Sequence, residues 1–231
     1  LGAVNGHTII AEQQTAGKGR MGKKFYAPNN QGIYLSVIVR PQLSVEYALM
    51  ITSCAAVAVA EAIEKVSGSD AASSLSLIHI SELPKGLEDI ATSIRAETGK
   101  NVNRSQLVAE ILNRLEVRLG DICTKEFLDD YRKRSIIIGK RIIITRNDVS
   151  ETVQCVDIDN LGKLVVRRDN GEEVALSTAT ITLLDDILIA DKKHIKNDLR
   201  IRYHKIFYAE VFYEYNYYCG QLPISSRKGN Q

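Results

Sequence analysis

AEQQTAGKGRMGKKFYAP, at Ala11–Pro28, is a loop rich in glycine and cations that lies between two strand-like runs. HTIIAE leads into it, and GIYLSVIVRP at Gly32–Pro41 follows it. Glycine can adopt positive φ and lets backbone N–H groups approach an anion. The loop also contains four cationic side chains: Lys18, Arg20, Lys23 and Lys24. The pattern indicates a loop that closes over an anionic ligand; a solvated basic loop is the alternative, because loop composition alone is only a correlation.

Three phosphate-binding motifs nearly fit this loop, and each lacks an essential part. Gly17, Gly19 and Gly22 spell the dinucleotide fingerprint G-x-G-x-x-G, but that motif must open a helix, and a β-rich run follows here. Gly17 through Lys23 also spells G-x-x-x-x-G-K, but Lys24 replaces the Ser or Thr that holds Mg²⁺. A kinase glycine loop does lie between two strands, but the chain has neither H-R-D nor D-F-G.

A longer pattern runs through residues 11–41. Its members are Glu12, Gln13, Gln14, Thr15, Ala16, Gly17, Lys18, Gly19, Arg20, Met21, Gly22, Phe25, Pro28, Tyr34, Ser36, Arg40 and Pro41. Their order and spacing resemble the start of the catalytic domain of biotin protein ligases, which typically shows E-Q-T-A-G-R-G-R-R-G-R, then Trp or Phe, a Pro, G-x-Y-x-S and R-P. Lys18 replaces the usual Arg, and Met21 replaces a second one. Lysine keeps the charge but loses the bidentate fork, so we expect a weaker grip on the ligand.

The resemblance implies an activity and a set of ligands. The family activates biotin with ATP to biotinyl-adenylate, and then transfers biotin to one lysine of the biotin carboxyl carrier domain of a biotin-dependent carboxylase. It therefore implies biotin, ATP and Mg²⁺ as ligands and cofactors, and that carrier domain as the partner. By position in the motif, the residues expected to line the biotin and adenylate site are Gln14, Gly17, Lys18, Gly19, Arg20 and Gly22. Arg20 is the expected catalytic residue.

The chemistry explains why such a site needs a closing loop. In the family the glycine loop is disordered when empty and folds over the ligand. Biotinyl-adenylate is a reactive mixed anhydride, and the exclusion of water prevents its hydrolysis. A cation at Arg20 can stabilise the charge on the α-phosphate during adenylation.

A buried helix is expected behind the loop, over Ser44–Ser67. Ser44 can cap it, Glu46 suits its first turn, and Gly68 can end it. Its sequence ALMITSCAAVAVAEAI is apolar almost all round, which predicts burial on every side. The family has such a helix packed on its sheet, and a generic core helix would look the same.

The resemblance stops after this helix. The family continues with K-W-P-N-D, a strand, G-I-L-x-E and G-I-G-I-N, and the K-W-P-N-D lysine contacts both biotin and the phosphate. This chain contains no Trp, so that block is absent, and Ser69–Glu82 stands in its place. Asn101 to Asn103 looks like the end of the third motif but belongs to a later helical segment. We therefore expect impaired catalysis; the alternatives are a non-catalytic relic with weak ligand or carrier binding, and an unrelated nucleotide-binding enzyme.

Two origins are open for Ser69–Glu82. Its end, SLSLIHISE, resembles the peptide obtained when sequencing-library adapter DNA is translated, and both flanks match the family while this segment does not. The alternative is a short replacement strand, with the alternating residues Leu75, Leu77, Ile78 and Ile80. The loss of core strands from a sheet is costly, which favours the first origin.

Two helices are expected after the interruption. LPKGLEDIATSI, from Leu83, matches a helix of the family; Gly99 can end it. The apolar face of this first helix consists of Leu87, Ile90, Ala91 and Ile94. Asn103 or Ser105 caps the second helix, and Gly120 ends it. The apolar stripe of the second helix consists of Leu107, Ile111, Leu112, Leu115 and Leu119.

Short β-rich runs follow FLDDYRKRS at Phe127–Ser135. They are IIIGKRIIIT, TVQCVDID, KLVVRR, EEVAL and STATITL. Asn160-Leu161-Gly162 and Asn170-Gly171 separate the later runs, and Asn-Gly is a strong hairpin signal. The series resembles the small C-terminal SH3-like barrel of the same family, which abuts the ATP and carrier-docking side.

The expected fold class is α+β. A biotin/lipoate-ligase-like catalytic domain, a mixed sheet with helices, occupies residues 1–125 and is interrupted at 69–82; the SH3-like β-barrel occupies residues 135–183. Residues 184–231 are an unassigned tail in which aromatic residues alternate with cations. Such a mixture can stack on single-stranded nucleic acid, but it contains no recognised RNA motif, and an appended or frame-shifted tail is the favoured interpretation.

Composition is that of an ordinary globular chain. Of 231 residues, 45% are hydrophobic and 25% charged, and the net charge of +2 is too small to favour nucleic acid or a membrane surface. No apolar run approaches the roughly 20 residues of a spanning helix, and no signal peptide is visible, although the chain can be truncated at Leu1. The four cysteines lack metal-ligand spacing, so we expect a reducing, cytoplasmic location. No DNA-binding module is visible before the loop, and a homodimer stays open.

Overall fold

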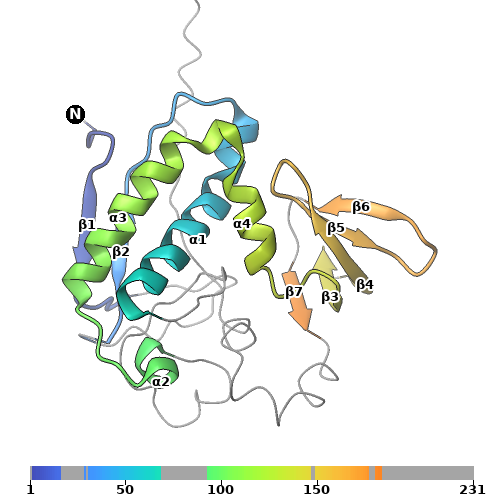
Figure 1. Cartoon of the computed structure of the whole chain (residues 1–231). Helices are drawn as coiled ribbons and strands as arrows, with labels where there is room; N and C mark the ends of the chain where they lie inside the picture. Colours follow the sequence, from blue (N-terminus) through green and yellow to red (C-terminus); the bar gives the residue numbers. More distant parts are fainter. Residues whose placement is uncertain are drawn as a thin grey trace, which may run out of the picture.

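The computed structural model (Figure 1) describes residues 2–16, 29, 31–68, 93–146, 149–176 and 180–183. Helices lie between a two-stranded sheet and a five-stranded antiparallel sheet. The elements are β1 (Thr8–Ala11), β2 (Tyr34–Val37), α1 (Val45–Ser67), α2 (Ile94–Thr98), α3 (Arg104–Gly120), the 3₁₀ helix η2 (Ile122–Thr124), α4 (Phe127–Arg134), β3 (Arg141–Arg146), β4 (Val149–Ile158), β5 (Leu164–Arg167), β6 (Glu173–Leu176) and β7 (Thr180–Leu183). This mixture confirms the expected α+β class.

The long helix α1 has the bounds that its sequence predicts. It begins after Ser44, and Gly68 ends it in the left-handed conformation at φ 71°, where its N–H donates to the carbonyl oxygen of Glu64. The Ser44 side chain makes no capping hydrogen bond, so the prediction of a serine cap is right in position and wrong in mechanism. The backbone carbonyl oxygen of Ser44 instead accepts a hydrogen bond of 3.1 Å from the N–H of Ala48.

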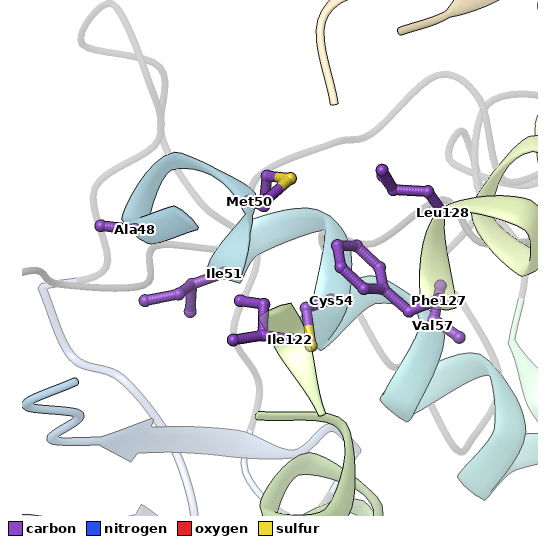
Figure 2. Packing of buried hydrophobic residues seen from close by; sticks show 8 residues of the cluster. All are labelled: Ala48, Met50, Ile51, Cys54, Val57, Ile122, Phe127 and Leu128. Atoms are coloured by element: carbon purple, nitrogen blue, oxygen red, sulfur yellow. The ribbon is translucent and has the colours of Figure 1, made fainter. Parts of the chain in front are cut away.

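Burial of α1 on more than one side produces the core. One cluster joins it to η2 and α4 (Figure 2) and consists of Ala48, Met50, Ile51, Cys54, Val57, Ile122, Phe127 and Leu128. A second cluster joins the C-terminal half of α1 to α2 and α3, with side chains before and on β2 packed against it. Its buried members are Ala60, Ala62, Ile63, Ile94, Leu107 and Ile111. The all-round apolar sequence of α1 is thus covered by elements from both ends of the domain.

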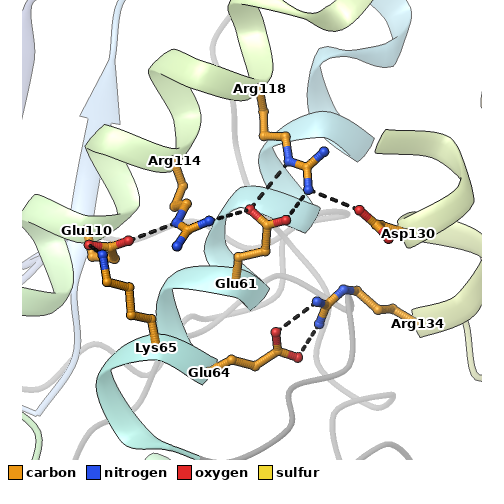
Figure 3. Close-up of polar contacts among 8 residues, drawn as sticks. All are labelled: Glu61, Glu64, Lys65, Glu110, Arg114, Arg118, Asp130 and Arg134. Atoms are coloured by element: carbon orange, nitrogen blue, oxygen red, sulfur yellow. Dashed lines mark hydrogen bonds and ion pairs between the residues drawn. The ribbon is translucent and has the colours of Figure 1, made fainter. Parts of the chain in front are cut away.

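Ion pairs join α1 to the two helices beside it (Figure 3). Glu61 of α1 binds Arg118 of α3, which also contacts Asp130 of α4 at 3.0 Å. Arg114 lies 3.7 Å from Glu61. The hydrogen bond from Arg118 to Glu61 raises the pKa of that guanidinium, so the arginine remains charged throughout the working range of pH.

A second pair lies one turn further along α1. Glu64 accepts a hydrogen bond of 2.8 Å from Nη2 of Arg134, the last residue of α4. On the α3 side, Lys65 and Arg114 both bind Glu110, at 2.9 and 2.8 Å. These two hydrogen bonds hold the pKa of Glu110 below its ordinary value. Three helices are therefore joined by charged side chains as well as by apolar ones.

The short helix α2 corrects one prediction. Ser93 has an extended backbone, and its hydroxyl accepts a hydrogen bond of 3.0 Å from the N–H of Ala96, so the helix starts at Ile94. Ile94 therefore begins a helix instead of lying within the one expected from Leu83 to Gly99. The other residues of that expected face, Leu87, Ile90 and Ala91, lie outside the described residues. Gly99 ends α2 as predicted.

The helix α3 follows its predicted bounds. The side chain of Asn103 accepts a hydrogen bond of 3.0 Å from the N–H of Gln106, which decides between the two candidate caps, and Gly120 is the last helical residue. Leu107 and Ile111 of the predicted stripe are fully buried, and Val108 joins them. The remaining stripe residues are half-buried: Leu112, Leu115 and Leu119.

The five strands β3 to β7 form one antiparallel sheet in the order β6-β5-β4-β3-β7. Gly162 and Gly171 occupy the two predicted turns with φ of 74° and 85°, where a side chain would strain the backbone. One face is closed over a small core of Ile142, Ile144, Val153, Cys155, Val166 and Leu176. The predicted strands are confirmed, and closure into an SH3-like barrel stays a prediction.

The β4–β5 turn docks this sheet on the helices. Arg132 of α4 donates to the carbonyl oxygen of Ile158 at 2.7 Å and to the side chain of Asn160 at 2.9 Å. At Gly162 an added Cβ would lie 3.6 Å from side-chain atoms of Met50 and of Ser53 in α1. The turn therefore rests directly on the helix layer.

No helix among the described residues has both the length and the hydropathy needed to cross a bilayer.

Two buried thiols provide a test of this packing. Burial raises the pKa of Cys54 and of Cys155 to about 12, whereas Cys123 is exposed. Because the thiolate is the nucleophile, iodoacetamide at pH 8 should label Cys123 in the folded protein, and the two buried thiols only in denaturant. Peptide mass spectrometry measures this, with Cys123→Ser as the control. Native labelling of Cys54 at the rate of Cys123 would contradict the burial of α1.

Arg118→Leu should destabilise the fold. The change leaves Glu61, whose side chain is 13% exposed, with the longer contact to Arg114. We expect the free energy of unfolding to fall by about 1–3 kcal/mol, between the costs for exposed and for buried ion pairs. Urea denaturation followed by circular dichroism measures it. The matched control is Arg141→Leu, whose pair with Asp169 is 54% and 74% exposed and should contribute less than about 1 kcal/mol; equal losses would refute the special role of Arg118.

Candidate functional site

The paired strands β1 and β2 form the base of the candidate site. They run antiparallel, with Thr8 opposite Val37 and Ala11 opposite Tyr34. The segment between Ala11 and Tyr34, which contains the glycine loop, therefore leaves and rejoins the small sheet at the same end. The sequence folds this way because both runs are rich in β-branched and aromatic residues, which suit strands.

The predicted site residues fall into two groups. Gln14 lies three residues after β1 and is exposed. The other predicted ligand-binding residues are Gly17, Lys18, Gly19, Arg20 and Gly22, and they lie outside the described residues. Their roles, including that of Arg20 as the catalytic residue, stay predictions.

Motif residues on the β2 side serve the scaffold. Tyr34 is 7% exposed and belongs to the strand that faces the helices. The backbone N–H of Arg40 donates to the Asn5 side chain at 2.7 Å, and its guanidinium binds the carbonyl oxygen of Ala3. Arg40 thus ties the chain after β2 to the residues before β1, which fixes the small sheet at that end.

Two residues at the base of the loop were missed by sequence reasoning. Arg104, the first residue of α3, donates from Nη1 to Oε2 of Glu12 at 2.5 Å, across 92 positions of sequence. Gln31 has a buried Oε1 that accepts no hydrogen bond from the residues that the structure describes. No local pattern marks either residue, and the partner of Arg104 lies in a distant part of the chain.

The described residues include no group of three or more His, Cys, Asp or Glu side chains that could hold a metal ion. The charged side chains near the loop base are Glu12 and Arg104, which are paired with each other. The geometry therefore provides a fixed platform of strands for the loop, with polar groups at both of its ends.

Two family models match the chain. The model of the biotin/lipoate A/B protein ligase family matches residues 3–103, and the biotin protein ligase C-terminal domain matches residues 137–184. Similar curated proteins are the bifunctional ligase/repressor BirA of Bacillus spizizenii and that of Bacillus subtilis, 28% and 27% identical over 160 residues. Each alignment covers 54% of this chain and 49% of the relative, so the chain spans about half the length of the curated relatives it matches.

Solved structures share the fold. The biotin protein ligase from Aquifex aeolicus in complex with biotin and ATP superposes with a TM-score of 0.69 at 18% identity, covering 80% of this chain and 92% of that one. The apo structure of the same enzyme gives 0.65 at 16% identity, covering 80% and 91%. The order of the two matched models is the order of the strand-and-helix part and the five-stranded sheet described above. The chain therefore belongs to the biotin protein ligase family.

Proposed function

We propose that the chain is an ATP-dependent biotin protein ligase, which forms biotinyl-adenylate and transfers biotin to a lysine of a biotin carboxyl carrier domain. The observation that carries the proposal is that the ligand motif begins directly after β1, at Glu12, and continues on β2 with Tyr34 and Ser36, while the two strands are paired with each other. A loop that starts and ends at the same end of a strand pair can close over a ligand without moving its ends. Both matched family models are ligase domains, which argues against the alternative of an unrelated nucleotide-binding enzyme.

The loop residues have separate tasks in this proposal. Gln14 offers an amide with donor and acceptor atoms to the ligand, and Gly17, Gly19 and Gly22 let backbone N–H groups approach the phosphate. Lys18 contributes charge, and Arg20 stabilises the negative charge that develops on the α-phosphate as the biotin carboxylate attacks it. Pyrophosphate leaves, and the closed loop keeps water from the mixed anhydride until the carrier lysine attacks.

Mg²⁺ accompanies ATP in this proposal. The ion is commonly bound through one or two carboxylates, substrate phosphates and retained waters, and the described residues hold no acidic cluster for it. It would neutralise charge on the phosphates. The cytoplasm, where ATP and reduced thiols are available, is the location that we propose for this activity.

The missing Lys-Trp-Pro-Asn-Asp block limits the proposed activity. The family's lysine in that block contacts both biotin and the phosphate, and this chain has no Trp with which to build the block. Binding through the loop can survive such a loss, because the β1–β2 platform is retained. A relic that binds ligand or carrier without turnover is the second candidate, and it rests on the same observation.

Carrier biotinylation tests the proposal. The chain is incubated with biotin, ATP, Mg²⁺ and a carrier domain, and the product is blotted with streptavidin. We expect little biotinylation by the chain as it stands. When residues 69–82 are replaced by the segment of an active family member that carries Lys-Trp-Pro-Asn-Asp, the rate should rise by about 100-fold or more, because placed charge contributes that much to such a step.

Matched variants identify the source of any gain. The same chimera with that lysine changed to Ala, or with Arg20→Ala, should fall back toward the rate of the unmodified chain. A chimera that binds a biotinyl-adenylate analogue but stays inactive would favour the relic. An unmodified chain as fast as an intact ligase would show that another cation has replaced the lysine, and our account of the missing block would fail.

A further inference from the structure

The end of β1 next to the ligand motif is weakly held by apolar packing. β1 has four residues and pairs with β2, and its side chains Ile9 and Ile10 are 57% and 51% exposed. The opposite end of the strand is held more firmly, because the N–H of Gly6 donates to the carbonyl oxygen of Ile38 at 2.7 Å, and the N–H of Ile38 donates to that of His7 at 2.9 Å. A strand fixed at one end and lightly covered needs another contact if its far end is to have a defined position.

Arg104 provides such a contact. Its guanidinium binds the Glu12 carboxylate, immediately after the last residue of β1. The Asn103 cap fixes the backbone at Arg104, and the fully buried Leu107 anchors the first turn of α3 in the core. Arg104 therefore projects from a rigid part of the fold. The planar guanidinium also restricts the direction of the bond more than an ammonium would.

The location of Glu12 gives this ion pair a consequence for the site. Glu12 precedes Gln14 by two residues, a span of at most about 7 Å in an extended chain. The positive end of the α3 dipole further favours a carboxylate at this place. The Glu12 side chain is 64% exposed, and ion pairs this open to water contribute little to the stability of the whole fold. We therefore expect the pair to act mainly on the position of the backbone at the start of the ligand motif.

We propose that Arg104 is a positioning residue for the start of the ligand motif: through Glu12 it fixes the backbone that leads to Gln14. The proposal rests on the proposed function for its ligand, and on the structure alone for the contact between Arg104 and Glu12. A fixed backbone at this point reduces the conformational freedom that ligand binding at Gln14 must remove, and so favours the bound geometry.

The first test needs no ligand. Hydrogen exchange is measured on the amides of Ile9–Gln14 in the full chain and in Arg104→Gln, Glu12→Gln and the matched control Arg141→Gln, whose ion pair lies on the five-stranded sheet. We expect exchange to speed up by about fivefold or more in the first two variants only, with unchanged thermal unfolding. Unchanged exchange, or a loss of global stability as large as the local effect, would overturn the proposal.

The second test uses a non-hydrolysable biotinyl-adenylate analogue and calorimetry. Arg104→Gln and Glu12→Gln should weaken binding by up to about fivefold, the limit for an exposed ion pair, and the exchanged pair Glu12→Arg with Arg104→Glu should recover most of it. If the unmodified chain binds no analogue, the proposed function fails, and the hydrogen-exchange result still shows whether the ion pair of Arg104 with Glu12 fixes the end of β1. If it binds and both single variants bind equally well, the positioning role is wrong although the function stands.

Discussion

The burial of α1 is the constraint on which the rest of the structure depends. A helix of 23 residues that is apolar almost all round has no face to give to water, so other elements must cover it on every side. Its first half is covered by η2 and α4, and its second half by α2, α3 and the chain at β2. Apolar contact is non-directional, so it does not by itself fix how the neighbouring helices are oriented on α1. The ion pairs of Glu61 and Glu64 fix that orientation, because each needs one particular arginine of α3 or α4 beside one turn of α1.

The same arrangement explains how the start of the ligand motif can lie beside β1, a strand that contributes little to the hydrophobic core. β1 buries few apolar side chains, yet β2 beside it contributes Leu35 to the cluster around α1. Arg40 and Arg104 tie the ends of the small sheet to neighbouring segments. Rigid elements thus support the start of the ligand motif, which is the usual division between scaffold and binding segment.

Sequence reasoning worked where the signals are local. The left-handed Gly68 marks the end of α1 and the Asn103 cap marks the start of α3, as the sequence predicts, and Asn-Gly together with Asn-Leu-Gly marks the turns of the five-stranded sheet. It failed at Ser93, because apolar spacing alone does not reveal where a helix starts, and a serine cap decides this. The pair of Glu12 with Arg104 could not be predicted, since the two residues are 92 positions apart in the sequence and no local pattern indicates that they meet. Of the predicted ligand-binding residues, Gln14 lies in the described part of the chain and the others do not.

The docking of the β4–β5 turn has a consequence for the modularity of the chain. Met50 and Leu128 belong to the helix core, and both also lie within 4.0 Å of the position that a Cβ on Gly162 would take. A cut between α4 and β3 would therefore expose apolar side chains on the helix side and leave the Arg132 guanidinium without its partners in the turn. Although the C-terminal family model begins there, at residue 137, the two parts share one boundary layer of side chains. Transplanting either part into another ligase would require that layer to be carried along with it.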